Sequence, residues 1–304
     1  MPAPSRTTAL SVETKVLSTL RFYAGGPYQS NVGQDVYTAM HQSSVSRSIS
    51  EVTNAINQHL FRRWVRFDLN PASTAALKEM FFKYGFPGVI GAIDGTHVAI
   101  VAPPVDDPVF NERAYFNYKR YHSINVQLVC DANMKILNVN SRYPGATNDS
   151  FIYANCSLRQ GLHEMLRQNQ NAWLLGDSGY PLEPCLMTPF MQDVDPLSPQ
   201  GRYNQCLRTA RSIIEQCNGL LKSRWRCLLK HRVLHYKPDQ ASRIVNACTV
   251  LHNMCLQGNV QLPDELLVHP QDLGMDAMNE VGVVNQNFRA GQLIRQRIID
   301  NYFM

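Results

Sequence analysis

A short apolar run that carries a single carboxylate constrains the fold of this chain more than any other stretch. Residues 88–101 are mostly hydrophobic and rich in β-branched side chains, which predicts a buried strand. Asp94 lies inside the run, where a charge is costly unless it is paired or binds a cation. Gly91 and Gly95 leave room beside it for a ligand or another backbone. We interpret Asp94 as one arm of a metal site; the alternative is a carboxylate that accepts hydrogen bonds from local backbone amides.

The composition describes an ordinary globular protein. Of the 304 residues, 44% are apolar and 17% are charged, enough for one large domain or for one domain with a smaller one. The formal charge of +5 is a weak argument for acidic partners such as nucleic acid. No apolar run reaches the ~18 residues of a membrane span, and the first residues lack the apolar core of a secretory signal. We therefore expect no membrane contact and a reducing compartment.

The eight cysteines are scattered along the chain and form no Cys-x-x-Cys pair. Cys248, His252 and Cys255 share a face of a predicted helix, but a fourth zinc ligand is not evident. We interpret the cysteines as small apolar side chains of the core.

The first part of the chain, residues 10–70, is predicted to be a small helical unit. Helices are predicted over 11–24, over 33–40 and from Ser44 onward, the last after a turn at 41–43. A short helix, a turn and a second helix form the layout of a helix-turn-helix. In that layout Arg47 would face a DNA groove, with Ser46 and Ser50 beside it. A plain helical bundle that packs onto the next domain fits the pattern equally well.

The central part, residues 85–257, alternates between strand and helix periodicity. Strands are predicted at 88–101, 123–130, 135–141 and 172–180, and helices at 73–84, 150–167, 203–224 and 239–257. A turn at 131–134 joins the second and third strands, and 181–201 is predicted to be a long loop. Hairpin-ordered strands followed by helices predict an α/β fold with a mixed sheet. Residues 258–304 are predicted to be a tail with a helix at 289–301.

Three carboxylates follow this pattern of elements. Asp94 and Asp177 each lie in or at the end of a predicted strand, and Glu215 lies at the edge of the apolar stripe of the 203–224 helix. Oxygen ligands of this kind hold divalent ions such as magnesium, and two such ions assist phosphodiester cleavage. Asp149, just before the 150–167 helix, can be a fourth ligand or the cap of that helix, and both readings stay open.

The region around Glu215 is strongly basic. Residues 202–232 hold eight Lys and Arg, while Glu215 is their only acid. Among these cations, Arg208, Arg211, Lys222 and Arg224 surround the predicted ligand. A solvated cationic face is the usual explanation for such a run. Because a phosphate backbone would have to lie beside the ligand, we favour DNA contact.

Six segments in this order resemble the motifs of Harbinger-type DDE transposases. They are Ile93-Asp-Gly-Thr-His97, Pro144-Gly-Ala-Thr-Asn-Asp-Ser150, Leu175-Gly-Asp-Ser-Gly-Tyr-Pro181, Arg211-x-x-Ile-Glu215, Gly219-x-Leu-Lys222 and Val250-Leu-His-Asn-Met254. The likeness covers roughly 10–256 and extends to the domesticated Harbinger transposase-derived nucleases of animals. Three positions depart from the family pattern: Asn218 stands where Phe is usual, Ala146 where Ser is commoner and Asn148 where His is commoner.

The resemblance implies an RNase H-like fold with Asp94, Asp177 and Glu215 as the DDE triad and Asp149 as a further metal ligand. It implies a divalent cation, Mg²⁺ or Mn²⁺, and nuclease chemistry on DNA in the nucleus, with the cytoplasm as a second location. Family members often work with a separate Myb-like DNA-binding protein, and a homo-oligomer is also left open. The alternative is a catalytically silent, domesticated transposase that serves as a DNA- or protein-binding module.

Overall fold

A computed structural model describes residues 10–26, 29–33, 40–267 and 287–304. Its centre is a five-stranded sheet with the spatial order β3-β2-β1-β4-β5. The strands are β1 (Val89–Ala99), β2 (Ser123–Cys130), β3 (Ile136–Pro144), β4 (Trp173–Leu175) and β5 (Leu186–Met187). The pairs β1–β2 and β2–β3 are antiparallel, whereas β1–β4 and β4–β5 are parallel. This confirms the predicted α/β class with a mixed, RNase H-like sheet.

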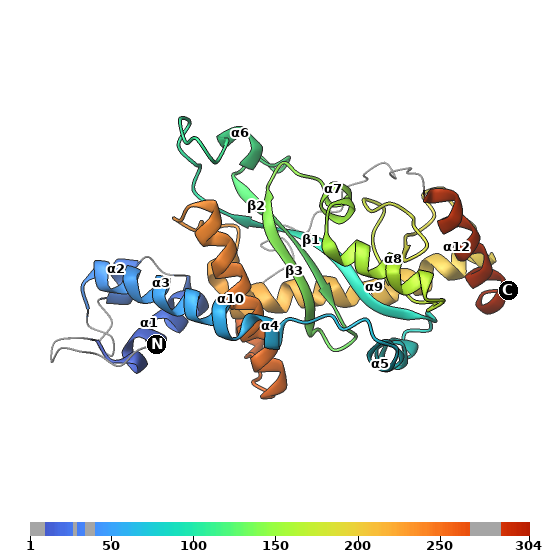
Figure 1. Cartoon of the computed structure of the whole chain (residues 1–304), viewed down its shortest axis with the longest axis horizontal. Helices are drawn as coiled ribbons and strands as arrows, with labels where there is room; N and C mark the ends of the chain where they lie inside the picture. The colour runs from blue at the N-terminus through green and yellow to red at the C-terminus, as the bar shows by residue number, and fades with distance from the viewer. Residues whose placement is uncertain (1–9, 27–28, 34–39, 268–286) are drawn as a thin grey trace.

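Helices pack against the sheet and also lie beyond it at both ends of the molecule. They are α1 (Val12–Gly25), α2 (Gln29–Gly33), α3 (Gln42–His59), α4 (Phe61–Trp64), α5 (Pro71–Phe82), α6 (Glu112–Tyr115), α7 (Asp149–Ala154), α8 (Ser157–Arg167), α9 (Pro199–Arg224), α10 (Pro238–Gln257) and α12 (Phe288–Tyr302), with short 3₁₀ turns at η1 (Arg226–Leu228) and η2 (Asp264–Leu266). Figure 1 shows α1–α3 at one end of the long axis and α12 at the other, with the sheet between them. None of the helices within the described residues has the length and apolar character that crossing a membrane requires.

The hairpin between β2 and β3 forms where the sequence predicts it. The carboxylate of Asp131 accepts hydrogen bonds from the backbone amides of Asn133 (2.8 Å) and Lys135 (3.0 Å), which closes the turn. Met134 takes the left-handed backbone conformation (φ 62°) that the turn needs. Every residue of β2 is buried, because the strand lies between β1 and β3 and also contacts α7 and α9.

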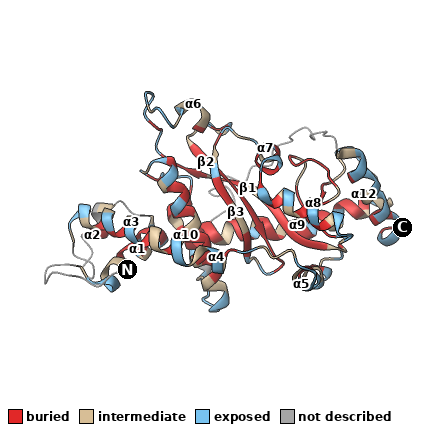
Figure 2. Ribbon diagram, viewed as in Figure 1, coloured by how far each residue is buried: buried red, intermediate tan, exposed pale blue. Residues whose placement is uncertain are grey.

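The helix α9 is the element on which the core is assembled. Ser198 caps its first turn by accepting a hydrogen bond from the amide of Gly201 (3.0 Å), and Pro199 occupies the first helical position. Its apolar side chains Leu207, Ile213 and Leu221 belong to the core that also includes the sheet. Figure 2 shows the buried residues running through the sheet and the inner faces of the helices.

Several predicted boundaries were wrong. The predicted turn at 41–43 is instead the start of α3, because His41 accepts a hydrogen bond from Ser43 and caps the helix. The second predicted helix, 33–40, falls mostly on residues 34–39, outside the described residues; α2 lies before it. The single helix predicted over 150–167 is two helices, broken at Asn155, whose side chain bonds back to the carbonyl of Phe151 (2.8 Å).

Other elements differ in length or were not predicted. The strand expected over 172–180 is only the three residues of β4, and β5 lies inside the expected loop. Both are too short for a periodicity of two to be visible in the sequence. The helix α9 starts four residues earlier than expected, at its Ser198 cap, and α4 and α6 are single turns that carry no periodic signal.

Candidate active site

Two of the predicted carboxylates come from neighbouring strands. In the parallel pair β1–β4, Ala92 lies opposite Leu175. Asp94 follows Ala92 by two residues and Asp177 follows Leu175 by two, so both lie at the same level beyond that pair. The carboxylate of Asp177 also accepts a hydrogen bond from the amide of Gly179 (3.0 Å), which shapes the turn after β4.

The third carboxylate reaches the same place from helix α9. Arg211 and Glu215 lie one turn apart on this helix and form an ion pair. The guanidinium of Arg211 also lies 3.5 Å from the Asp94 carboxylate. Glu215 keeps 44% of its side chain exposed, whereas Asp94 is only 14% exposed. Asp94 from a strand and Glu215 from a helix therefore contact the same guanidinium, and the Glu215 side chain is partly exposed to solvent.

The carboxylate of Asp149 lies against β1 beside Gly95, the residue that follows Asp94. Asp149 is the first residue of α7, and the helix cap is its neighbour Asn148, which accepts a hydrogen bond from the amide of Phe151 (2.9 Å). Asp149 therefore does not have the capping role. Asn125 on β2 donates a hydrogen bond to it (2.8 Å), and a Cβ atom at Gly95 would collide with its carboxylate. Only glycine at this position of β1 allows so close an approach.

The electrostatics of Asp94 reflect this convergence. Burial raises the pKa of Asp94 well above its usual value, and the guanidinium of Arg211 opposes that shift. The charges of Asp177, Asp149 and Glu215 raise the pKa of Asp94 further, because like charges this close disfavour ionisation. A cation bound among these carboxylates would relieve their repulsion.

The donor set fits a divalent ion. Carboxylates and neutral oxygens are the ligands that magnesium and manganese prefer. Three further buried oxygens, on Tyr180, Asn125 and Asn218, have no hydrogen-bond partner among the described residues. Two belong to amides whose nitrogens bind the site: Asn218 donates to Asp94 (2.9 Å) and Asn125 donates to Asp149. Buried polar atoms without partners are uncommon, and water or an ion usually satisfies them.

These three residues were missed by the sequence reasoning. Asn218 was noticed only as a departure from the family pattern, and its role as a donor to Asp94 explains why an amide can stand there. The Tyr180 hydroxyl is buried beside the cluster; burial and then the charges of Asp149, Asp94 and Asp177 raise its pKa well above the usual value. Nothing in the local pattern of Asn125 or Tyr180 indicates such a contact, since one depends on the register of β2 and the other on the fold of the turn after β4.

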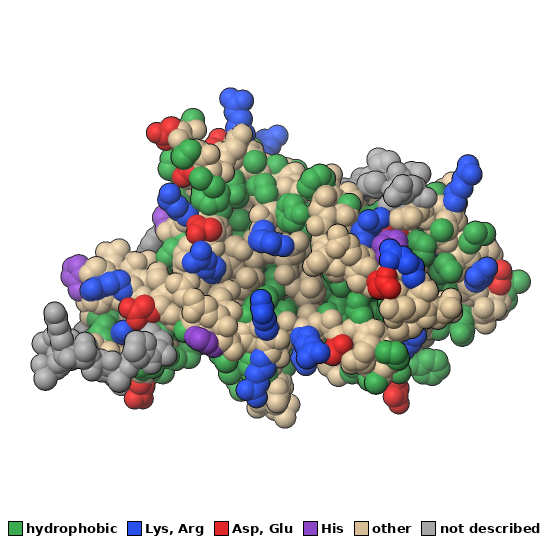
Figure 3. Space-filling view, viewed as in Figure 1, with side chains coloured by type: hydrophobic (Ala, Val, Ile, Leu, Met, Phe, Trp, Pro, Cys, Tyr) green, Lys and Arg blue, Asp and Glu red, His purple; other side chains and the backbone are tan. Residues whose placement is uncertain are grey.

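The predicted DNA-binding cations are divided between surface and interior. Arg47 on α3 and Arg208 on α9 are exposed, and Figure 3 shows that Lys and Arg side chains are spread over one face of the molecule. Lys222 is only 1% exposed and donates to the carbonyl of His97 (2.9 Å), and burial lowers its pKa to about 7. Arg224 is also buried and donates to the carbonyl of Val260 (2.8 Å). Neither Lys222 nor Arg224 is placed where a phosphate from solvent would meet it.

A second group of metal-type ligands lies apart from these carboxylates. His163, Glu183 and Cys185 have ligand atoms within 4.8 Å of one another. The buried carboxylate of Glu183, however, already accepts from Arg159 through both of its oxygens (2.9 Å each) and contacts His163 (3.1 Å). A guanidinium in this position repels a cation, so the group is best explained as a buried ion pair that ties α8 to the segment before β5.

Comparison with known proteins identifies the family to which this chain is similar. Residues 93–253 match the family described as DDE superfamily endonuclease. The chain is 34% identical over 290 residues to the putative nuclease HARBI1 of Homo sapiens, which covers 90% of this chain and 78% of that protein. The same protein of Xenopus laevis is 33% identical over 285 residues, covering 90% and 78%.

Plant proteins show a weaker likeness. Protein ALP1-like of Arabidopsis thaliana is 27% identical over 279 residues, which is 87% of this chain and 66% of that protein. No solved structure matches the chain. The matched segment begins at Ile93, directly before Asp94, and includes Asp149, Asp177 and Glu215.

Proposed function

This chain belongs to the DDE superfamily of endonucleases, and from that premise we propose that it is a divalent-metal-dependent nuclease that hydrolyses phosphodiester bonds of DNA. One observation supports the proposal more strongly than the others. The Arg211 guanidinium contacts Asp94 from a strand and Glu215 from a helix, so carboxylates far apart in the chain meet at one point. An ion pair that only stabilises the fold does not need two further aspartates around it, nor buried oxygens that lack hydrogen-bond partners among the described residues.

Asp94, Asp177, Glu215 and Asp149 would hold the cations, Mg²⁺ or Mn²⁺. When bound, two such ions neutralise charge on the scissile phosphate and favour deprotonation of an attacking water. The chain's own residues prepare the site: Asn218 and Asn125 each orient one carboxylate by hydrogen bonding. The partly exposed Glu215 marks the side from which a DNA backbone can enter.

The proposed DNA surface includes Arg208 and Arg47. Arg208 lies three residues before Arg211 on α9 and is exposed, so it can meet a phosphate near the carboxylates. Arg47 lies on α3, which packs against α10 and through it joins the catalytic part of the molecule. A nuclear location, with the cytoplasm as a second, and a Myb-like partner that supplies sequence specificity belong to the same proposal. So does a homo-oligomer.

The competing function is a catalytically silent module that only binds DNA or protein. Such a module has no chemical need for clustered carboxylates, whose mutual repulsion is unfavourable without a cation. The presence of Asp94, Asp149, Asp177 and Glu215 in one place therefore favours the nuclease.

Plasmid nicking by the purified chain tests the proposal. We expect nicking in Mg²⁺ or Mn²⁺, none in EDTA, and a loss of more than about a hundredfold in Asp94→Asn, because a lost ligand should cost at least as much as a lost supporting partner. Asp106→Asn, an exposed aspartate outside the site, is the matched control and should nick at the wild-type rate. Wild-type nicking by Asp94→Asn, or nicking that survives EDTA, would show that these carboxylates are not the catalytic site.

A further inference from the structure

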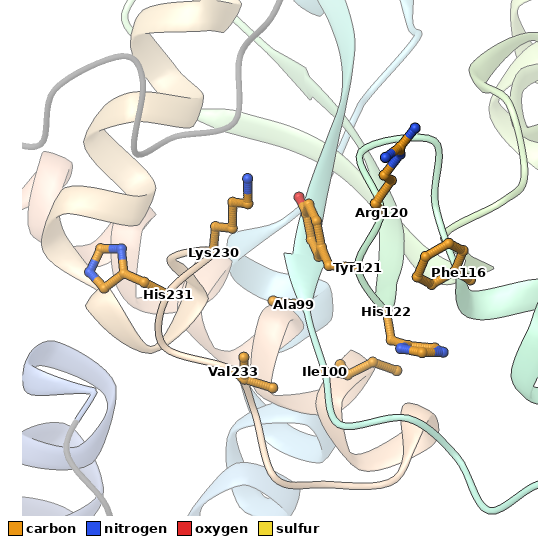
Figure 4. A pocket seen from close by; sticks show the side chains of 9 residues that line it. All are labelled: Ala99, Ile100, Phe116, Arg120, Tyr121, His122, Lys230, His231 and Val233. Carbon is orange, nitrogen blue, oxygen red and sulfur yellow. The ribbon is translucent and has the colours of Figure 1, made fainter.

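A pocket of about 580 Å³ opens at the end of β1, away from the carboxylates. Two segments far apart in the chain form its walls: residues 116–122, before β2, and residues 230–233, after η1 (Figure 4). The side chains that give it chemical character are Phe116, Arg120, Tyr121, His122, Lys230 and His231. We refer to it as the Tyr121 pocket.

The walls of the Tyr121 pocket are held by backbone hydrogen bonds. Leu234 exchanges two of them with the end of β1: its amide donates to Ala99 (2.9 Å), and its carbonyl accepts from Val101 (3.0 Å). On the opposite wall, the amide of Asn117 donates to the carbonyl of Tyr121 (3.0 Å), and Arg120 takes the left-handed conformation (φ 63°) that closes this turn. The pocket is therefore formed before any ligand arrives, which reduces the entropic cost of binding.

Aromatic faces and cations alternate around the opening. The Lys230 amine lies 5.1 Å from the centre of the Tyr121 ring, a cation–π contact, and Figure 4 shows the two side chains next to each other. Phe116 is 45% exposed and its ring lies 5.2 Å from that of His122. Among the described lining residues there is no carboxylate, while Arg120 and Lys230 both carry a positive charge. Glu112, which pairs with His122, lies outside the lining.

This combination matches one ligand chemistry. A nucleotide offers an aromatic base and an anionic phosphate, and proteins bind single-stranded nucleic acid by stacking its bases on aromatic side chains while cations follow the backbone. A fully paired base is stacked in its duplex and cannot enter a pocket. The ligand that fits is therefore an unpaired nucleotide.

The position relative to the carboxylates makes DNA the source of that nucleotide. β1 pairs continuously with β2 from Ala92 to Ala99, so the pocket wall at Ala99 lies five residue positions along the strand from Asp94. At about 3.3 Å per residue this is about 17 Å, a distance that one bound DNA molecule can span. His97 lies between the two places, with its ring 6.3 Å from that of Tyr121.

We propose that the Tyr121 pocket binds an unpaired nucleotide of the DNA substrate, about 17 Å from the phosphate that is cleaved. Its base stacks on Tyr121 and Phe116, and its phosphate is bound by Arg120 and Lys230. The proposal deepens the nuclease function above and rests on it for the identity of the ligand. It makes DNA with a frayed or single-stranded end, instead of an intact duplex, the preferred substrate.

Fluorescence anisotropy of the full chain with two labelled DNAs tests this binding. One is a blunt duplex; the other is the same duplex with an oligo(dT) tail of roughly ten nucleotides, within the range of single-strand sites. The Asp94→Asn background prevents cleavage during the measurement. We expect the tail to increase affinity, Tyr121→Ala to weaken tailed-duplex binding by about 5- to 150-fold, and blunt-duplex binding to change little. Tyr121→Trp, which keeps a stacking surface, should restore the tail effect.

Two further variants keep the result independent of folding defects. Lys230→Gln changes an exposed side chain and should reduce the salt slope of tailed-duplex binding by about one unit. Tyr302→Ala, an exposed tyrosine on α12, is the matched control and should bind like the parent protein. Equal affinity of all variants for the tailed duplex, or no advantage of the tail in the parent, would overturn the pocket proposal.

The outcomes separate this proposal from the nuclease function. If the chain nicks plasmid in Mg²⁺ but the tail has no effect, the nuclease stands and the pocket proposal is wrong. If the tail effect depends on Tyr121 and Lys230 but Asp94→Asn nicks as well as wild type, the pocket binds DNA and the catalytic assignment is wrong.

Discussion

At the scale of single residues, Arg211 is the most informative side chain of the molecule. The sequence placed it among cations expected to contact DNA, but in the structure it pairs with Asp94 and Glu215. Burial opposes its charge, yet the charges of Asp94 and Glu215 raise its pKa above the usual value, so it stays a cation. Arg211 is thus an internal counter-ion in the place that a divalent ion would share.

Replacing Arg211 should make the protein less stable alone and more responsive to metal. In Arg211→Gln the buried carboxylate of Asp94 loses its charged partner, which costs on the order of 3 kcal/mol. A divalent ion then binds without displacing the guanidinium. We expect a lower Tm in EDTA than for wild type, and a larger rise in Tm on adding Mn²⁺. Differential scanning fluorimetry measures both, with Arg208→Gln as the exposed control on the same helix; equal Mn²⁺ shifts in all three proteins would contradict the counter-ion role.

His97 shows how a partly buried polar residue beside the candidate site can serve the fold. Its Nδ1 lies 3.0 Å from the Ser123 hydroxyl, and burial, with the charges of Lys222 and Lys119, lowers its pKa to about 3. In the unfolded chain histidine titrates near 6.5. Between about pH 3 and pH 6.5 the folded state therefore holds His97 neutral, whereas the unfolded chain protonates it.

This difference predicts a specific loss of stability in acid. Because the folded pKa of His97 lies below the unfolded one, its contribution is fully present above about pH 6.5 and declines as the pH falls towards 3. Between pH 7.5 and 5, wild type should lose up to about 2 kcal/mol more than His97→Gln in urea unfolding. His59→Gln, an exposed histidine at the end of α3, should follow wild type. Parallel pH curves for wild type and His97→Gln would exclude the effect.

At the scale of elements, the sequence was most informative where a run was long and its period clear. The strand 123–130 and the helices near 73–84 and 239–257 were predicted close to their observed bounds, because each buries a regular apolar face. β4 and β5 were not, since strands of three and two residues are defined by pairing with β1 and with each other. The break between α7 and α8 depends on a side-chain bond at Asn155, which no periodicity reveals.

The approach of α7 to β1 gives the clearest prediction at this scale. Gly95 is the point where the Asp149 carboxylate passes the strand, and any Cβ atom there would collide with it. Gly95→Ala should displace the Asp149 carboxylate from the cluster and lower metal-dependent nicking by about 10- to 100-fold, the usual cost of disturbing a metal ligand. Gly258→Ala, at the C-terminal end of α10, removes a glycine that makes no such approach and should nick like wild type. A fully active Gly95→Ala with a native far-ultraviolet spectrum would show that Asp149 need not lie there.

At the scale of the whole molecule, the fold class could be predicted and the convergence of the site only in part. The order of the motifs, with Asp94 and Asp177 on strands and Glu215 on a helix, could be taken from the sequence. Two of the contacts that orient these residues come from distant parts of the chain: Asn218 on α9 lies 124 positions from Asp94, and Asn125 on β2 lies 24 positions from Asp149. The boundary proposed near residue 70 remains a prediction, and the packing of the first helices bears on it.

The N-terminal helices share their core with the catalytic part of the chain. Phe22 of α1 is buried, with its ring 6.0 Å from that of Tyr236, and the Tyr23 ring lies 6.4 Å from that of Trp225, just after α9. The side-chain amide of Asn57 on α3 donates to the backbone carbonyl of Arg243 on α10 (2.9 Å). Phe22, Tyr23 and Trp225 belong to one continuous hydrophobic cluster that also includes residues of the sheet. Contacts of this kind couple the two parts in unfolding.

Phe22→Ala should therefore destabilise the whole molecule and not the first helices alone. Removing a buried phenylalanine costs about 3–5 kcal/mol, and a shared core transmits that loss to every element packed on it. We expect one unfolding transition, shifted to lower urea, that coincides when followed by tryptophan fluorescence and by far-ultraviolet circular dichroism. Phe82→Ala, a largely exposed phenylalanine at the end of α5, is the control and should leave the transition unchanged. Two separated transitions in Phe22→Ala would mean that residues 10–70 unfold as an independent domain, and the shared core would then not couple the two parts.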